Sequence, residues 1–464
     1  MDDNTFDLVV IGSGPAGQKG AIAAAKMGKR VAVVDRNDMI GGVCLHAGTI
    51  PSKTLRLAVL YLTGFQQKSF YGQAYAPRSH VTADDLMFRV RTVIDREQAT
   101  VTDQLQRNDV TLVNGWARFV DAHTVQTDGG RQVRGDHILI ACGTRSARNP
   151  EIPYDGRKIM LAEDFGRGDR EKIPRSVIVV GAGVIGLEYA SMLSALGVRV
   201  TLIESRDTML DFVDKEIIEA LRYHMRRRDA IFRLGEHVVG VRVQDNGLVR
   251  AELESGKRVT GDALLYTVGR QSNADQLQLD RIGIDTDPRG RIAVNQYFQT
   301  SRPHIYAVGD CIGFPALAST SMEQGRLAST HMFDGPSLES APFFPYGIYT
   351  IPEISMVGRT EQELTAERVP YEVGKCLYED VAKAQMVGDR AGMLKLIFDP
   401  DTLKLLSVHA IGEDATEIIH IGHAVIALGG TIEYFRDNVF NYPTFAEAYK
   451  VAAYDGFNKI AEMR

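Results

Sequence analysis

The sequence contains few cysteines, and none of them is closely paired with another. Four cysteines, at positions 44, 142, 311 and 376, occur among 464 residues, so neither a C-x-x-C motif nor a disulfide-rich scaffold is present. Such sparing use is typical of a reducing compartment, and we expect the cytoplasm. We interpret the last three of these cysteines as packing residues.

Long hydrophobic runs and a strong excess of one charge are also missing. The longest apolar stretch, at 176–198, is interrupted by Gly181, Gly183, Gly186 and Glu188, which favours strand, turn and helix over a membrane span. A net charge of -6 gives no electrostatic reason to expect nucleic acid or an anionic membrane as partner. The acidic start, Met1-Asp2-Asp3-Asn4, fits neither a secretory signal nor a transit peptide.

A glycine-rich motif stands near the start of the chain. A strand-like segment at 8–11 leads into Gly12-Ser13-Gly14-Pro15-Ala16-Gly17, a helical pattern to about residue 27, and a strand at 31–34 followed by Asp35. In such a unit the first glycine allows a tight turn, and the second lets the backbone approach a pyrophosphate. The third glycine permits close packing, and the acidic residue accepts hydrogen bonds from a ribose.

The same motif returns in the middle of the chain. A strand-like segment at 177–180 leads into Gly181-Ala182-Gly183-Val184-Ile185-Gly186, a helix to about residue 196, and a strand at 198–203 followed by Glu204. The acidic residue follows the first glycine by 23 positions in both copies. One such motif is weak evidence, but two complete copies predict that the chain binds two dinucleotides.

Proline- and glycine-rich stretches mark the expected domain boundaries, at 148–153, 269–273 and 335–345. Together with the two glycine motifs, these boundaries predict an α/β protein with two Rossmann-like domains and a C-terminal α+β domain. The first Rossmann-like domain would comprise 1–150 and 271–340, and the second, 151–270, would be inserted into it. The C-terminal domain, 341–464, would contain strands at 392–398 and 405–411 and helices near 415–428 and 444–462.

Further motifs link the chain to a known family. Residues 41–53 read Gly-Gly-Val-Cys-Leu-His-Ala-Gly-Thr-Ile-Pro-Ser-Lys, and characteristic segments recur at 140–144, 305–310 and 441–447. With these, the chain resembles the pyridine nucleotide-disulfide oxidoreductases over essentially its whole length. The resemblance implies one non-covalent FAD per chain in the first domain and NAD or NADP in the second. It also implies a homodimer or higher homo-oligomer formed through the C-terminal domain.

The resemblance implies roles for individual residues. Lys53 would pair with Glu188 beside the flavin, which would spare both from being unpaired buried charges. The expected catalytic residues are Lys53, Glu188, Thr49, Tyr442 and Glu447. The expected cofactor-binding residues are Gly12, Gly14, Pro15, Ala16, Gly17, Asp35, Arg36, Gly41, Gly42, Val43, Cys44, Thr49, Lys53, Gly115, Ala141, Gly143, Thr144, Gly181, Gly183, Val184, Ile185, Gly186, Glu204, Arg206, Gly269, Arg270, Gly309, Asp310 and Ala318.

Two departures from the family pattern bear on the reaction. Disulfide reductases of this family have a second cysteine where this chain has Thr49, and a histidine where it has Tyr442; only Glu447 is retained. A threonine hydroxyl neither forms a disulfide nor acts as a thiolate. We therefore predict that the chain does not reduce disulfides.

What remains is enough for hydride to pass onto FAD and off again. The segments at 48–53 and 441–444 closely resemble those of the soluble, energy-independent pyridine nucleotide transhydrogenases. This resemblance implies reversible, ping-pong hydride transfer between NADPH and NAD+, or between NADH and NADP+. Two alternatives stay open: an NAD(P)H:quinone or dye oxidoreductase, and a nucleotide-sensing regulatory flavoprotein. A mercuric reductase is disfavoured because the chain lacks the active-site and C-terminal cysteine pairs.

The second motif carries mixed signals about its nucleotide. Glu204 suits the free ribose hydroxyls of NAD, whereas Arg206 is able to pair with the 2′-phosphate of NADP. A loop arginine exposed to solvent explains Arg206 equally well. The helical spacing of Glu417, His420 and His423 is more typical of surface or interface groups than of ligands, and no metal site is predicted.

Overall fold

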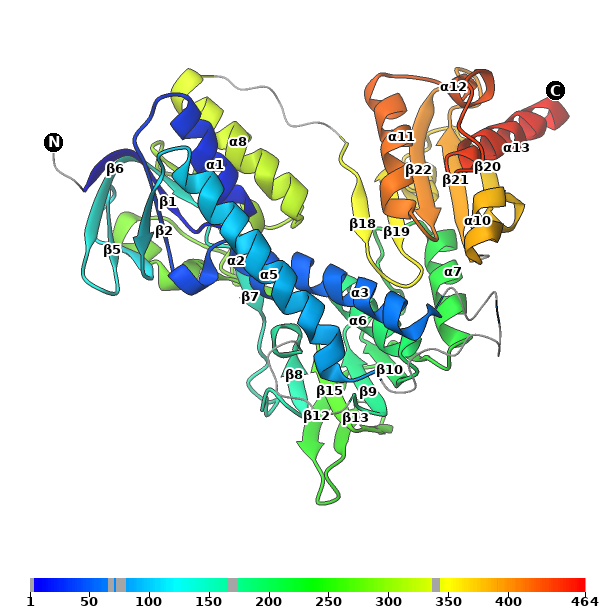
Figure 1. Ribbon diagram of the computed structural model, residues 1–464, viewed down its shortest axis with the longest axis horizontal. Coiled ribbons are helices and arrows are strands. Elements are labelled where there is room, and N and C mark those ends of the chain that lie inside the picture. The colour runs from blue at the N-terminus through cyan, green and yellow to red at the C-terminus, as the bar shows by residue number, and fades with distance from the viewer. Residues whose placement is uncertain are drawn as a thin grey trace. The chain divides into compact units, whose positions relative to one another are not determined.

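The computed structural model describes residues 4–65, 71, 81–165, 173–335, 343–389 and 391–463. The chain divides into two compact units (Figure 1). Unit 1 contains Met1–Leu55, Met87–Arg148 and Val268–Pro342, and unit 2 contains Arg56–Leu86, Asn149–Thr267 and Phe343–Arg464. The boundary expected at 335–345 lies largely at 336–342, outside the described residues.

Unit 1 is built on a seven-stranded sheet of order β3-β2-β1-β6-β5-β4, with β17 also paired to β6. β1 is parallel to β2 and β6, and its Leu8, Val9 and Val10 are fully buried, as expected for a strand covered on both faces. The strands are β1 (Thr5–Ile11), β2 (Val31–Asp35), β3 (Thr111–Asn114), β4 (Ala117–Phe119), β5 (Thr124–Thr127), β6 (Gln132–Ile140) and β17 (Ile305–Ala307).

Helices of unit 1 pack closely through glycine. α1 (Pro15–Lys26) and α8 (Ala318–Asp334) lie side by side, as Figure 1 shows. A Cβ atom on Gly325 of α8 would come within 2.0 Å of the Ala16 carbonyl oxygen, so this approach requires glycine. The other elements of unit 1 are α2 (Gly42–His46), β7 (Thr144–Ser146) and β16 (Arg270–Ser272). α3 (Thr49–Thr63) begins in unit 1 and ends in unit 2, and α5 (Ala83–Gln106) begins in unit 2 and continues in unit 1.

Unit 2 contains the second glycine motif and a five-stranded parallel sheet of order β11-β10-β9-β15-β8. A three-stranded antiparallel sheet, β12-β13-β14, follows β11 in the chain. The elements are β8 (Ile159–Leu161), β9 (Ser176–Val180), α6 (Val184–Ala195), β10 (Arg199–Glu204), α7 (Lys215–Arg226), β11 (Ile231–Leu234), β12 (Val238–Val243), β13 (Val249–Leu253), β14 (Arg258–Gly261) and β15 (Ala263–Tyr266).

The C-terminal part of unit 2 is an antiparallel sheet of order β18-β19-β22-β21-β20 with helices packed on it. Phe398, Phe435 and Tyr449 are fully buried in its core. The elements are β18 (Tyr346–Ile348), β19 (Ile354–Gly358), α9 (Glu361–Ala366), β20 (Glu372–Leu377), α10 (Ala382–Val387), β21 (Met393–Phe398), β22 (Leu405–Ile411), α11 (Ala415–Ala427), α12 (Glu433–Asp437) and α13 (Glu447–Met463). Short 3-10 helices occur at Asn37–Met39, Ala162–Asp164, Asn273–Gln276, Leu279–Ile282, Gly309–Ile312 and Tyr378–Asp380.

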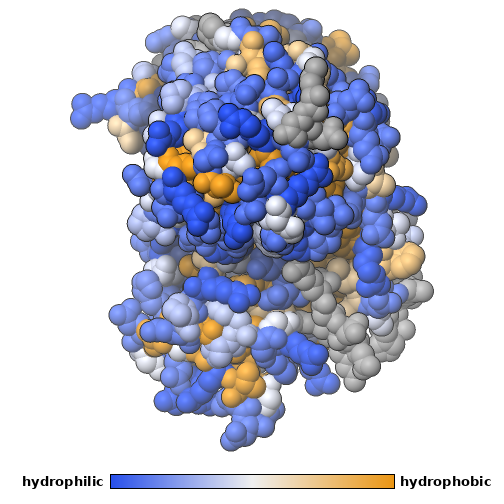
Figure 2. Space-filling model, turned by 90° about the vertical axis from the view of Figure 1, so that its left-hand side faces the viewer, coloured by the Kyte–Doolittle hydropathy of each residue, from blue (hydrophilic) through white to orange (hydrophobic). Residues whose placement is uncertain are grey.

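These elements confirm the predicted α/β fold, with a mixed sheet in unit 1 and a parallel sheet in unit 2 that each carry a glycine turn, and an α+β C-terminal part. The last helix begins at Glu447 rather than near 444, because residues 441–446 form turns. Among the described residues, no helix combines the length and apolar character that a bilayer span requires. On the face shown in Figure 2, hydrophobic residues form small groups among hydrophilic ones, as on an ordinary protein surface.

Candidate nucleotide-binding sites

The first glycine turn connects β1 to α1. Gly12 has a φ of +101°, and a Cβ atom there would lie 2.4 Å from the Ala141 carbonyl oxygen. A Cβ on Gly17 would lie 1.9 Å from the Gly12 oxygen, so both positions require glycine for packing. At Gly14 the nearest atom would be 4.0 Å away, at the Cα of Gly42. The turn is therefore packed behind and open at its middle glycine, which fits the approach of a pyrophosphate to the start of α1.

Asp35 closes this turn from the end of β2. Its Oδ2 atom accepts hydrogen bonds from the backbone N–H and the hydroxyl of Ser13, both at 2.6 Å. Burial raises the pKa of Asp35, and the two bonds from Ser13 act against that rise. Gly115 donates its N–H to the Asp35 carbonyl oxygen at 3.1 Å. The guanidinium of Arg36 pairs with Asp38 and lies over the Trp116 ring.

Other residues expected to bind FAD gather around the same turn. A Cβ on Gly42 would come within 2.9 Å of the Gly14 Cα, and one on Gly309 within 3.2 Å of the Ala16 Cβ. Thr144 donates its hydroxyl to Asp310 at 3.2 Å, although the two residues are 166 positions apart. Arg270 donates to Thr144 through Nε and Nη2, both at 2.7 Å, so the structure places it beside this group.

Cys44 and Thr49 lie next to each other where α2 gives way to α3. Burial raises the pKa of the Cys44 thiol, whereas a hydrogen bond with the Thr49 side chain acts to lower it. The thiol is therefore protonated at neutral pH, and its neighbour is a hydroxyl rather than a second sulfur. All four cysteines of the chain are free.

The second glycine turn connects β9 to α6 and repeats the first. Gly181 has a φ of +100°, and a Cβ on Gly186 would lie 1.9 Å from the Gly181 carbonyl oxygen. A Cβ on Gly183 would meet nothing within 4 Å, so this turn is also open at its middle glycine. Thr267 supports the turn from behind by donating its hydroxyl to the carbonyl oxygens of Val180 and Gly181 at 2.8 and 3.1 Å.

Glu204 lies at the end of β10, in the position that Asp35 holds in the first motif. Its Oε2 atom accepts from the Ala182 N–H at 2.7 Å, and its Oε1 atom accepts from the backbone N–H and Nε of Arg206. Burial acts to raise the pKa of Glu204, but the bonds from Ala182 and Arg206 outweigh it and hold the pKa below its usual value. Arg206 also pairs with Asp211, with 3.3 Å between Nη1 and Oδ2.

The remaining expected catalytic residues are positioned by different elements. Lys53 lies in α3 of unit 1, and Glu188 is buried in α6 of unit 2, where its Oε1 accepts the Tyr349 N–H at 2.9 Å. Tyr442 is 72% exposed in the single chain. Glu447 begins α13, and its buried Oε2 has no hydrogen-bond partner among the described residues.

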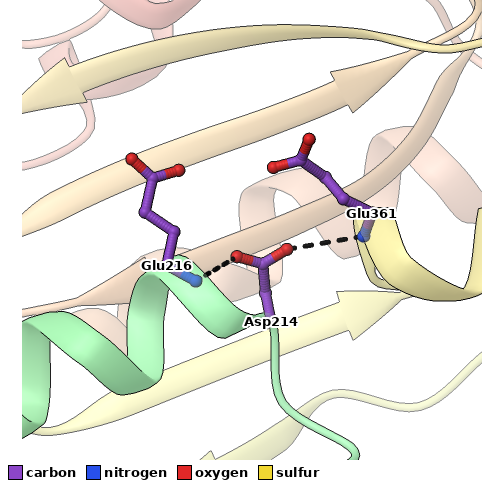
Figure 3. A group of neighbouring side chains, drawn as sticks. All are labelled: Asp214, Glu216 and Glu361. Atoms are coloured by element: carbon purple, nitrogen blue, oxygen red, sulfur yellow. Dashed lines mark hydrogen bonds between the residues drawn. The ribbon is translucent and has the colours of Figure 1, made fainter. Parts of the chain in front are cut away.

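One group of carboxylates has the spacing of a metal site. Among the described residues, one group of three or more potential metal ligands has ligand atoms that all lie within 4.8 Å of one another. It consists of Asp214, Glu216 and Glu361 (Figure 3). Asp214 also accepts the backbone N–H groups that begin α7 and α9. The ammonium of Lys395, a fully buried side chain, bonds to all three carboxylates. A lysine therefore supplies the positive charge that a metal would bring. His420 and His423 lie elsewhere, with ring centroids 6.5 Å apart.

Sequence reasoning overlooked several residues in or near the two turns. Ser13 stands inside the first motif and was detectable as a hydroxyl next to the middle glycine. Thr267 and Asp211 carry no such signal, because one is 86 positions from its partner in the turn and the other is one of several acids in a loop.

The chain matches two family models. Residues 6–325 match the pyridine nucleotide-disulphide oxidoreductase model, and residues 344–453 match the dimerisation domain of the same family. The soluble pyridine nucleotide transhydrogenase of Mycobacterium tuberculosis (strain ATCC 25177 / H37Ra) is 52% identical over 460 residues, which cover 98% of each chain. That of Serratia proteamaculans (strain 568) is 44% identical over 463 residues, again 98% of each chain.

Solved structures agree with this relationship. The chain is similar to LpdA from M. tuberculosis, with a TM-score of 0.88 and 26% identity over 96% of this chain and 99% of that one. It is also similar to the HOCl-induced flavoprotein disulfide reductase RclA from Escherichia coli, with a TM-score of 0.87 and 25% identity over 97% and 99%. The chain belongs to the pyridine nucleotide-disulphide oxidoreductase family, among the soluble pyridine nucleotide transhydrogenases.

Proposed function

We propose that this protein is a transhydrogenase that moves hydride reversibly between NADPH and NAD+, or NADH and NADP+, with a non-covalent FAD as the intermediate carrier. Bound FAD supplies the chemistry by accepting a hydride from one nicotinamide and returning it to another. The alternating nucleotides would use one site in turn, which is a ping-pong mechanism.

The observation that carries the proposal is the side chain next to Cys44. A disulfide reductase needs two sulfurs that reach each other, and here the neighbour of Cys44 is the Thr49 hydroxyl. Both glycine turns remain complete, each open at its middle glycine and closed by an acidic residue. The chain thus keeps what two nucleotides need and lacks what a dithiol relay needs.

The two turns would divide the nucleotides between them. In unit 1 the Gly12–Gly17 turn would hold the FAD pyrophosphate, Asp35 its adenosine ribose, and Asp310 its ribityl chain. In unit 2 the Gly181–Gly186 turn and Glu204 would hold the nicotinamide nucleotide in the same way. We assign 1–150 and 271–340 to FAD binding, 151–270 to nucleotide binding and 341–464 to dimerisation.

We assign Lys53 and Glu188 to the electrostatics of the flavin. A lysine cation there would stabilise negative charge on the reduced isoalloxazine, and the Glu188 carboxylate would keep that cation paired. The Tyr349 N–H, at 2.9 Å, orients the Glu188 carboxylate. Thr49 would stand where the disulfide reductases of the family have their second cysteine. Tyr442 and Glu447 would complete the site of a partner subunit.

We further propose a homodimer in the cytoplasm. The match of 344–453 to a dimerisation domain supports the dimer. The exposure of Tyr442 in the single chain also supports it, because a tyrosine with a functional role is expected to be covered in the assembly.

The decisive experiment uses the purified protein loaded with FAD. NADPH is mixed with a spectrally distinct NAD+ analogue, and parallel reactions contain a quinone or lipoamide as acceptor. We expect rapid nucleotide-to-nucleotide transfer and negligible lipoamide reduction. Fast quinone reduction with negligible transfer would instead identify a quinone oxidoreductase, and negligible turnover with every acceptor would identify a nucleotide-sensing protein.

A further inference from the structure

The cation expected to recognise NADP is already engaged by two carboxylates. Arg206 donates through Nε to Glu204 at 3.2 Å and lies 3.3 Å through Nη1 from Asp211. A guanidinium has five N–H donors, so these contacts leave others for an incoming phosphate. A 2′-phosphate bound to Arg206 would therefore lie close to Asp211 as well as to Glu204.

The two carboxylates differ in what they do. Glu204 is buried, closes the glycine turn through Ala182, and is the acidic residue proposed above to hold the nucleotide ribose. Asp211 is 65% exposed and contacts no part of that turn among the described residues. Its negative charge near Arg206 thus has no evident role in binding NAD, yet it would oppose a phosphate.

Asp211 is also held in place. It follows Met209 and Leu210, which are buried and anchor the loop between β10 and α7. Arg206 is fixed independently, because its backbone N–H donates to Glu204 and its carbonyl oxygen accepts the Gly235 N–H at 2.8 Å. Removing the Asp211 charge should therefore leave Arg206 where it is.

We propose that Asp211 is a specificity-determining residue that weakens NADP(H) binding and so brings its affinity closer to that of NAD(H). The idea rests on the proposed transhydrogenase function, since an enzyme that exchanges hydride between both nucleotides must not retain one of them too tightly. The Asp211 carboxylate and a 2′-phosphate would both lie against Arg206, so the two negative charges would repel each other across a short distance. Because Asp211 is exposed to solvent, this repulsion would weaken NADP(H) binding only modestly.

The test compares Asp211→Asn with the parent protein, both loaded with FAD. Binding of NADP+ and NAD+ is measured by titration calorimetry, which does not depend on turnover. We expect NADP+ to bind about three- to tenfold more tightly to Asp211→Asn, and NAD+ affinity to change by less than about twofold. The gain should shrink as salt is added.

Asp207→Asn is the matched control. Asp207 is exposed in the same loop, and it forms no ion pair with Arg206 in the part of the chain that the structure describes. The substitution removes the same charge, and we expect it to leave both affinities within about twofold of the parent.

Several results would overturn the inference. They are an unchanged or weaker NADP+ affinity in Asp211→Asn, an equal gain for NAD+, or the same gain in Asp207→Asn. If the parent transfers hydride between nucleotides while Asp211→Asn shows one of these results, only the role of Asp211 fails. If NADP+ binds to none of the three proteins, the proposed function fails and this inference fails with it.

Discussion

The carboxylate of Glu204 accepts a hydrogen bond from the backbone N–H of Ala182 at 2.7 Å. Asp35 makes the equivalent bond to the N–H of Ser13 in the first glycine turn at 2.6 Å. In each unit the acidic residue is thereby fixed against the turn that would receive the pyrophosphate. Two nucleotides would be held by one local geometry, repeated in two parts of the chain.

Removal of the Arg206 side chain is expected to weaken NADP(H) selectively. A charge-assisted contact contributes roughly 1.5 to 3 kcal/mol, or about a 10- to 150-fold loss, and the exposure of Arg206 favours the low end. Arg206→Ala should leave NAD(H) nearly unchanged, whereas Glu204→Ala should weaken NAD(H) and relieve repulsion toward NADP(H). The measurement is kcat/KM for NADH and NADPH with a common dye acceptor at fixed salt. Equal losses for both nucleotides in Arg206→Ala would show that another cation reads the phosphate.

Two glycines of the second turn should respond differently to alanine. A Cβ on Gly183 meets nothing within 4 Å, so Gly183→Ala should fold normally. It should lose nucleotide affinity, by about tenfold or more, because the methyl group would face the pyrophosphate. A Cβ on Gly186 lies 1.9 Å from a carbonyl oxygen, so Gly186→Ala should lower the melting temperature through overpacking of roughly 1–3 kcal/mol. Calorimetric binding and thermal unfolding separate the two effects. A destabilised Gly183→Ala would contradict this division.

Cys44 is expected to be dispensable for hydride transfer between nucleotides. Its thiol has a pKa raised by burial and lies beside the Thr49 hydroxyl, so it has no sulfur partner there. Cys44→Ser should retain transfer between NADPH and an NAD+ analogue, and the parent should reduce lipoamide, glutathione disulfide and mercuric ion poorly. Two-electron reduction of the parent should give no thiolate-to-flavin absorbance band. A strong band, or lipoamide turnover that matches nucleotide turnover, would refute the assignment.

Lys395 is expected to be essential for the stability of unit 2. Its buried ammonium bonds to Asp214, Glu216 and Glu361. Lys395→Met would remove this positive charge from the three carboxylates. Breaking such a buried pair costs roughly 3–5 kcal/mol. Lys375→Met is the control. Lys375 is partly exposed and, among the described residues, forms an ion pair only with Glu216, so its loss should cost at most about 1 kcal/mol. Thermal unfolding at pH 7 would measure both variants, and equal losses would contradict the prediction.

The effect of Lys395→Met should depend on pH. Burial acts to raise the pKa values of Asp214 and Glu216, but nearby positive groups outweigh it and hold them below the ordinary 3.8 and 4.5. A carboxylate with a lowered pKa contributes stability that is present above its unfolded pKa and is lost as pH falls through the folded one. Without Lys395 the burial of these carboxylates is less opposed, so the difference in melting temperature between parent and Lys395→Met should be largest near neutral pH and shrink progressively as the pH falls. A difference that grows on acidification would rule this out.

The sequence by itself determined the features that depend on local spacing. Two glycine turns, each with an acidic residue 23 positions after its first glycine, follow from backbone geometry within one βαβ unit. The replacement of a second cysteine by Thr49 was equally readable, because a missing sulfur is a matter of residue type. The fold class and the family followed from these local patterns.

Only the tertiary structure decided which distant side chains meet. Thr144 reaches Asp310 across 166 positions, and Lys395 reaches Asp214 across 181, in contacts that no local pattern specifies. In the sequence, Asp211 is one of several acidic residues in its loop, and only the folded structure shows that it lies against Arg206. The periodicity of a chain fixes its strands, helices and turns, whereas ion pairs between them depend on how those elements pack, and packing is a property of the whole fold.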